Sequence, residues 1–132
     1  MQHEKPPLMF WAISAVGLLW NLAGCWNYLV QTNPEAVAQM PELYRVVIEN
    51  RPVWAQAGFA VSVFAGAVGC ILMLLRRKIA TQLLVLSLLG TIAVFYFGLR
   101  VFGFDPATFS ALVMSLALLW FSTLAARRGW TR

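Results

Sequence analysis

Long runs of residues without a charged side chain dominate the chain. Four runs of 29, 24, 21 and 21 residues contain no Asp, Glu, Lys or Arg: 6–34, 52–75, 79–99 and 106–126. About 20 apolar residues are enough for a helix to cross the hydrocarbon core of a bilayer. Buried helices of soluble proteins rarely extend so far without a charge. The pattern therefore predicts four transmembrane helices, at about 8–30, 53–75, 79–102 and 107–125.

The one long connection, residues 31–52, has a different pattern. Apolar residues recur there at helical spacing, and Glu42, Arg45 and Glu49 fall on the opposite face. Pro41 must break or restart any helix in this segment. We predict one or two short amphipathic helices that lie at the outer membrane surface.

The composition agrees with an integral membrane protein and argues against two other classes. Hydrophobic residues make up 61% of the 132 residues and charged residues make up 11%. In a soluble domain about half of the residues are hydrophobic and about a quarter are charged. Disorder needs low hydrophobicity and high charge, and each helix of a soluble bundle needs a charged face. We predict an all-α integral membrane protein with one domain, 1–132, formed by an antiparallel bundle of four transmembrane helices. A short outward-facing amphipathic segment joins the first two helices.

Basic residues are distributed unequally between the two sides of this topology. Seven lie on the side of the chain ends: Lys5, Arg76, Arg77, Lys78, Arg127, Arg128 and Arg132. Three lie on the opposite side: Arg45, Arg51 and Arg100. Because Lys and Arg favour cytoplasmic loops, we predict that both termini are cytoplasmic. The clustered cations suit anionic lipid headgroups rather than nucleic acid, and we expect such contacts at Arg76, Arg77, Lys78, Arg127 and Arg128.

The connection between the third and fourth spans is short. Gly103 is expected to end the third helix as a left-handed residue, and Asp105 followed by Pro106 is expected to start the fourth. Arg100 lies in the last turn of the third helix, where a cation suits the helix dipole. We expect a structural role for Arg100, in which it meets Asp105, Glu49 or a lipid phosphate.

Small and polar residues form one stripe along each predicted span. On the first span the stripe consists of Gly17, Asn21, Gly24 and Tyr28. Stripes of this kind are the usual contact faces of membrane helices. Counting residues from the span ends places several polar side chains at one depth: Asn21, Ser62, Thr91 and Ser115.

This polar layer has two interpretations. The first is an interhelical hydrogen-bond clamp, in which Asn21 faces the interior and bonds Ser62 or Thr91, because an amide in hydrocarbon needs a partner. The second is a small polar pocket that opens outward past Tyr28 and Gln56. The candidate site residues are Trp20, Asn21, Tyr28, Gln56, Ser62, Thr91 and Ser115.

Several kinds of chemistry are missing from the sequence. No charged residue or histidine lies in the middle of a predicted span, whereas ion-coupled carriers usually have one there. The small multidrug resistance exporters have a similar size but need a carboxylate in the first helix. His3 is the one histidine, so neither a metal site nor a cofactor is expected. Without a Cys-x-x-Cys motif or a nucleophile beside a base, we expect no enzymatic activity.

The segment Leu22-Ala23-Gly24-Cys25 looks like the lipobox of bacterial lipoproteins, which is cleaved before a lipidated cysteine. An apolar helix continues directly after it, where a lipoprotein usually begins a polar tether. We expect the first span to remain attached.

Several short motifs carry a resemblance to a known family. They are Leu19-Trp20-Asn21-Leu22-Ala23-Gly24, then Tyr28 and Gln31, Pro34-Glu35-Ala36 and Arg51-Pro52-Val53-Trp54. The chain resembles a family of small four-span bacterial inner-membrane proteins that are often labelled "sugar transporter". The resemblance covers most of the chain and implies a bacterial inner-membrane location and a solute-related role. It assigns no binding residue.

Two functions remain open on the sequence. The chain is either a non-enzymatic accessory or interaction subunit, or a binder or carrier of a small sugar-like solute with a pocket around Asn21. Because four short spans enclose little volume, a carrier is expected to be a homo-oligomer.

Overall fold

Four long helices form the molecule in the computed structural model, which describes residues 5–104 and 106–132. They are α1 (Leu8–Gln31), α4 (Val53–Leu74), α5 (Ala80–Phe102) and α6 (Pro106–Arg127). All four are long and apolar enough to cross a membrane, with mean hydropathy between 1.6 and 2.2. The four spans predicted from the charge pattern are confirmed, with ends that differ by no more than two residues.

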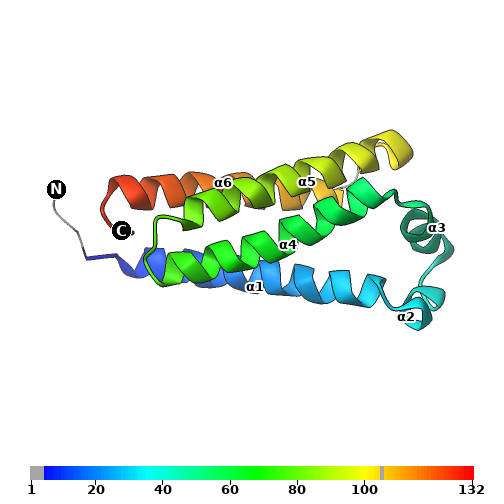
Figure 1. The fold of residues 1–132 in the computed structure, drawn as a ribbon, viewed down its shortest axis with the longest axis horizontal. Helices are drawn as coiled ribbons and strands as arrows, with labels where there is room; N and C mark the ends of the chain where they lie inside the picture. Colours follow the sequence, from blue (N-terminus) through cyan, green and yellow to red (C-terminus); the bar gives the residue numbers. More distant parts are fainter. Residues whose placement is uncertain (1–4, 105) are drawn as a thin grey trace.

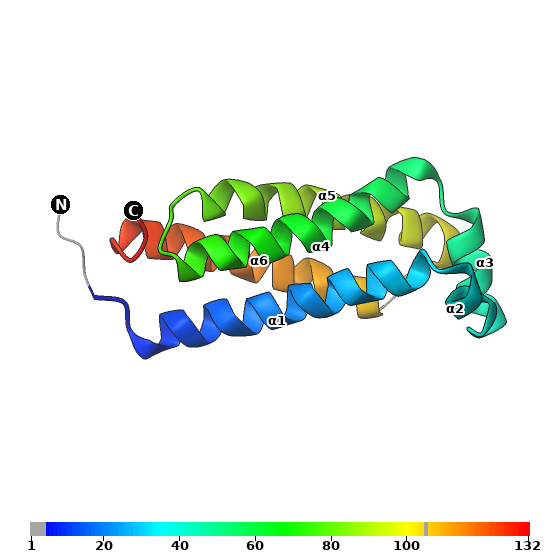
Figure 2. The same cartoon turned by 60° about the horizontal axis from the view of Figure 1, so that its bottom comes forward.

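The long helices alternate in direction and lie side by side as a bundle (Figures 1 and 2). α4 packs along both α1 and α5, and α5 packs along α6, whereas α1 and α6 meet only over a short stretch. The α4–α5 loop and the C-terminus lie at one end of the bundle, called the terminal end below. The opposite end is called the α3 end.

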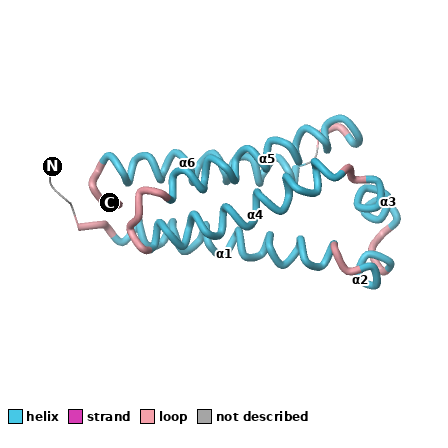
Figure 3. The backbone as a smooth tube through the Cα atoms, viewed as in Figure 1, coloured by secondary structure: helices cyan, strands magenta, loops and turns pink. Residues whose placement is uncertain are grey.

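Two short helices cross the α3 end (Figure 3). They are α2 (Pro34–Ala38) and α3 (Glu42–Asn50). The Asn33 side chain caps α2 by accepting a hydrogen bond from the Glu35 backbone N–H at 3.0 Å. Pro41 immediately precedes α3, so the predicted break at this proline is confirmed.

Two similar turns shape the terminal end. Arg76 and Gly129 have positive φ angles of 62° and 77°, and each follows the end of a long helix in the manner of a Schellman turn. The N–H of Arg77 donates to Leu72 O at 2.9 Å, and the N–H of Trp130 donates to Ala125 O at 2.9 Å. After each turn, backbone groups remain available, so that the α4–α5 loop and the C-terminal tail can form hydrogen bonds with each other.

The C-terminal tail is held against the α4–α5 loop. Arg132 N donates to Arg76 O at 2.7 Å, Lys78 N donates to Arg132 O at 2.9 Å, and Arg76 Nε donates to Trp130 O at 2.7 Å. Trp130 is 7% exposed, and its ring centroid lies 5.9 Å from that of Phe10 and 6.1 Å from that of Phe121. The tail thereby closes the apolar core of the terminal half.

The α4–α5 contact depends on glycine. A Cβ atom on Gly90 would lie 2.5 Å from Gly58 O and 2.8 Å from Ser62 N, closer than atoms can approach. The small-residue stripes therefore act here as a contact face that lets two backbones approach.

The C-terminal end of α5 differs in detail from expectation. Gly103 ends the helix with φ 82° and ψ −152°, which is an extended glycine conformation rather than the left-handed one that was predicted. The Arg100 side chain is exposed and donates to the Tyr96 hydroxyl at 3.0 Å. Glu49 is therefore not its partner, and Asp105 lies outside the described residues.

Candidate functional site

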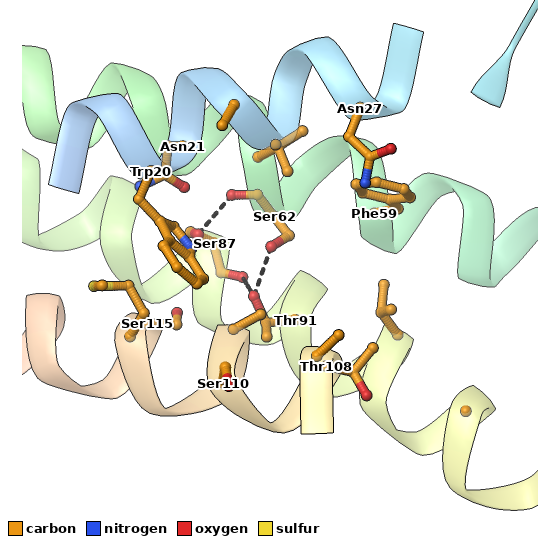
Figure 4. Close-up of a pocket in the computed structure, with 18 of the residues that line it drawn as sticks. Trp20, Asn21, Asn27, Phe59, Ser62, Ser87, Thr91, Thr108, Ser110 and Ser115 are labelled. Atoms are coloured by element: carbon orange, nitrogen blue, oxygen red, sulfur yellow. Dashed lines mark hydrogen bonds between the residues drawn. The ribbon is translucent and has the colours of Figure 1, made fainter. Parts of the chain in front are cut away.

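A cavity of about 830 Å³ lies between the four long helices toward the α3 end. Leu84 and Leu118, both part of the apolar core, close it on the side of the terminal end. Leu118 lies against Gly17, where a Cβ atom would be 2.7 Å from Leu118 Cδ2. Beyond this contact of α6 with α1, the two helices line opposite sides of the cavity (Figure 4).

The wall of the cavity is rich in hydroxyl and amide groups. Figure 4 shows Ser62, Ser87, Thr91 and Ser115 directed toward the space between the helices. The polar residues that line it are Asn21, Asn27, Gln31, Arg51, Ser62, Ser87, Thr91, Thr108, Ser110 and Ser115. Arg51 is the one charged residue among the described residues of the lining. The wall of the cavity is thus largely apolar, with hydroxyl and amide groups and a single positive charge set into it.

Three hydroxyl groups on α4 and α5 form a chain of hydrogen bonds. Ser87 Oγ donates to Ser62 O at 2.6 Å, and Thr91 Oγ1 donates to Ser87 O at 2.9 Å. Ser62 Oγ lies 2.6 Å from Thr91 Oγ1. Because the single Thr91 hydroxyl proton is already used, Ser62 must be the donor in that contact. Lone pairs of these oxygens remain as acceptors along this wall.

Asn21 faces the interior, as predicted, and is 8% exposed. Its Nδ2 donates to Gly17 O at 2.8 Å and to Cys70 Sγ at 3.8 Å, and its Oδ1 lies against Gly66. The predicted hydroxyl partners of Asn21, Ser62 or Thr91, were wrong, since the Ser62 and Thr91 side chains bond each other. The reason is that Asn21 reaches the next glycine along α4, one turn beyond Ser62.

Ser115, unlike Asn21, is buried without a hydrogen-bond partner for its side chain. It is 8% exposed, yet its hydroxyl has no hydrogen-bond partner. A buried hydroxyl without a partner is unfavourable by about 1–3 kcal/mol. Ser115 therefore contributes a hydroxyl without a partner to the cavity wall, although neighbouring atoms cover its oxygen.

Trp20 lies at the edge of the cavity between α1 and α6. Its indole extends from α1 toward Ser115 in Figure 4, and the residue is 44% exposed. The ring thus has one side on the cavity and one side on the surface of the bundle. This is the position of a side chain that covers a lateral opening.

Two of the predicted pocket residues lie elsewhere. The Tyr28 ring packs edge-on against Phe59 and Phe64, with centroid distances of 5.4 and 5.7 Å. Gln56 accepts a hydrogen bond from Arg51 Nη1 at 3.4 Å. Neither lines the cavity, because counting residues from a helix end gives depth but not rotation about the axis.

Asn27 and Gln31 occupy the mouth where the other two residues were expected. Together with Trp20 and Ala23 they form a face of α1 at steps of 3, 4 and 4 residues. This face is rotated by about 100° from the stripe that contains Asn21, because successive residues turn by that angle. The spacing of Asn27 and Gln31 from Trp20 was the signal that sequence reasoning missed.

Ser87 is a second residue that the sequence reasoning did not select for the pocket. It is 4% exposed and lies four residues before Thr91. Two hydroxyl residues at this spacing share one helix face, so their joint position was visible in the sequence.

Arg51 lies at the mouth of the cavity, just before α4. Its guanidinium is 5.3 Å from the centroid of the Phe59 ring, and none of the described carboxylates forms an ion pair with it. Burial lowers the pKa of Arg51 from its ordinary value, while the nearby Tyr28 acts in the opposite direction. An arginine remains charged under such a shift, so the mouth carries an uncompensated positive charge.

Metal ligands do not gather in the part of the chain that is described. No three His, Cys, Asp or Glu side chains there come close enough to hold an ion, and Cys25 and Cys70 are free and buried. No protein-family model, curated protein or solved structure matches the chain. The function of the chain must therefore be inferred from the geometry of the cavity.

Proposed function

We propose that this small polytopic membrane protein is a non-enzymatic binder or carrier, and that its ligand occupies the cavity beside Ser115. The carrying observation is a hydroxyl-lined cavity of about 830 Å³ inside the bundle. Protein interiors are otherwise packed as densely as organic crystals. An interaction subunit needs an external surface and not an internal polar cavity, so the geometry favours binding over a purely accessory role.

One chain supplies the entire lining of this cavity. Residues from α1, α3, α4, α5 and α6 all contribute. Transport by two copies is compatible with this arrangement.

We propose that the chain resides in a bacterial inner membrane, with the terminal end in the cytoplasm. The support is the excess of basic residues at that end, together with the resemblance to small inner-membrane proteins. Arg76, Arg77, Lys78, Arg127 and Arg128 would then meet anionic headgroups. A periplasm-dependent reporter is expected to be inactive at the C-terminus and active between α2 and α3, and the reverse pattern would refute this orientation.

The binding function is tested by filling the cavity. Ala111 lines the cavity on α6, so Ala111→Phe is expected to displace the ligand. Ala57 is exposed on α4 and does not line the cavity, which makes Ala57→Phe the matched control. Native mass spectrometry of the full chain, released from a mild detergent, is expected to show a retained small molecule for the wild type and the control but not for Ala111→Phe. Equal retention by all three chains would contradict the proposal.

A further inference from the structure

An apolar groove follows the cavity toward the terminal end. It has a volume of about 380 Å³ and lies between α1 and α6, where Val16 and Ala117 are among its lining residues. Met114 and Leu118 line both the groove and the cavity. The groove therefore begins where the polar wall ends.

Three kinds of surface thus succeed one another along the bundle axis. The positive charge of Arg51 lies at the α3 end, the hydroxyl groups follow, and the apolar groove comes last. Phe59, under the guanidinium, precedes Ser62 by three residues, which is about 4.5 Å along a helix. The order of charge, polar groups and apolar surface is the order of groups in a membrane amphiphile.

We propose that the ligand is an anionic glycerophospholipid, with its phosphate at Arg51, its glycerol backbone beside the hydroxyl groups of the cavity wall and one acyl chain in the groove between α1 and α6. The inference rests on the proposed binding function and adds the class of ligand. The occupant comes from the surrounding leaflet and not from the aqueous phase.

The mouth has the chemistry that a phosphate requires. Arginine binds phosphate through two parallel hydrogen bonds, and such charge-assisted bonds are about twice as strong as neutral ones. Arg51 has only a neutral side-chain partner at 3.4 Å in Gln56. A lipid phosphate would therefore supply the compensating charge that no described carboxylate provides.

The groove has the chemistry and the position that an acyl chain requires. Its lining is apolar, and α1 and α6 contact each other at Gly17 and Leu118 and again at Phe10 and Phe121. A lipid chain can enter sideways there, beside Trp20, without passing through water. A soluble phosphorylated solute would satisfy Arg51 but would leave this groove empty.

The test uses photoreactive phosphatidylglycerol with a diazirine in one acyl chain, added to the full-length protein in mild detergent. Cross-links are expected on peptides that contain 12–17 and 114–121. Diacylglycerol with the same chains, which has no phosphate, is expected to label them about tenfold less, because a hydrogen bond to a charged group contributes free energy of that order. Excess glycerol 3-phosphate is expected not to compete, whereas competition would identify a soluble anion as the ligand and overturn the lipid assignment.

Two pairs of variants test the headgroup contact and the acyl-chain contact separately. Arg51→Gln is expected to reduce labelling by phosphatidylglycerol to the level of the phosphate-free diacylglycerol, whereas Arg100→Gln, at an exposed arginine, leaves it unchanged. Ala117→Phe fills the groove and is expected to abolish labelling, whereas Ala15→Phe, at an exposed α1 position outside both lining sets, does not.

The outcomes distinguish this inference from the proposed function. Equal labelling by both lipids, or labelling that ignores Arg51→Gln, would overturn the inference. If the wild type still retains a molecule that Ala111→Phe loses, the binding function stands with another ligand.

Discussion

The two halves of the bundle differ in how their interior is filled. In the terminal half, Phe10, Met73, Phe121 and Trp130 are buried in one apolar cluster. In the α3 half, the same helices surround a cavity with polar groups on its wall, and α4 and α5 are joined there by hydrogen bonds among hydroxyl groups as well as by the close contact of Gly58 and Gly90. One set of four helices is thus closed at one end and open at the other.

The difference shows how a small membrane protein can combine stability with a binding site. Lipid tails are as apolar as leucine, so membrane helices associate mainly through close packing and hydrogen bonds. The terminal half supplies packing through its aromatic cluster and the paired tail. The α3 half can then enclose a cavity without loss of the fold.

The largest effect on stability is expected from the aromatic cluster. Trp130→Ala removes a ring that is 7% exposed and should lower the free energy of unfolding by about 3 kcal/mol or more. Trp120→Ala is the control, because Trp120 is 62% exposed and should change stability little. Thermal unfolding in detergent measures both, and equal losses would show that the tail does not close the core.

A smaller effect is expected at the glycine contact between α4 and α5. Gly90→Ala should destabilise the protein by about 1–3 kcal/mol through overpacking, because its Cβ would meet the backbone of α4. Gly98→Ala should be tolerated, since its nearest neighbour would be Thr108 Oγ1 at 3.9 Å. Equal tolerance of both changes would argue against the close approach of these helices.

Replacing Asn21 and Asn27 with alanine should have opposite effects on stability and on ligand retention. Asn21→Ala removes buried hydrogen bonds and should lower stability by about 1 kcal/mol or less, while ligand retention persists. Asn27→Ala, at the exposed mouth, should leave stability unchanged and reduce retention. Unfolding and native mass spectrometry on the same samples compare the two, and a loss of retention only in Asn21→Ala would reverse the assignment.

The sequence predicted the helices far better than the site. Charge-free runs and prolines act locally, so they located the spans and the break before α3. Burial of Trp130 was beyond reach, because it depends on the positive φ of Gly129 and on Phe10, 120 positions away. The same reasoning joined Ser62 and Thr91 by depth but misplaced Tyr28, since the rotation of each helix is set by packing.

The most direct test of the difference between the halves compares two buried serines on α6. Ser115 and Ser122 are seven residues apart and share one helix face within about 20°, but Ser115 lines the cavity and Ser122 pairs with Thr81. Ser115→Cys and Ser122→Cys would be made in chains with Cys25 and Cys70 replaced by alanine, freed of bound lipid in detergent and treated with N-ethylmaleimide, which alkylates thiolates. Rapid alkylation of Ser115→Cys with protection of Ser122→Cys is the expected result. Equal protection of both thiols would contradict an open α3 half.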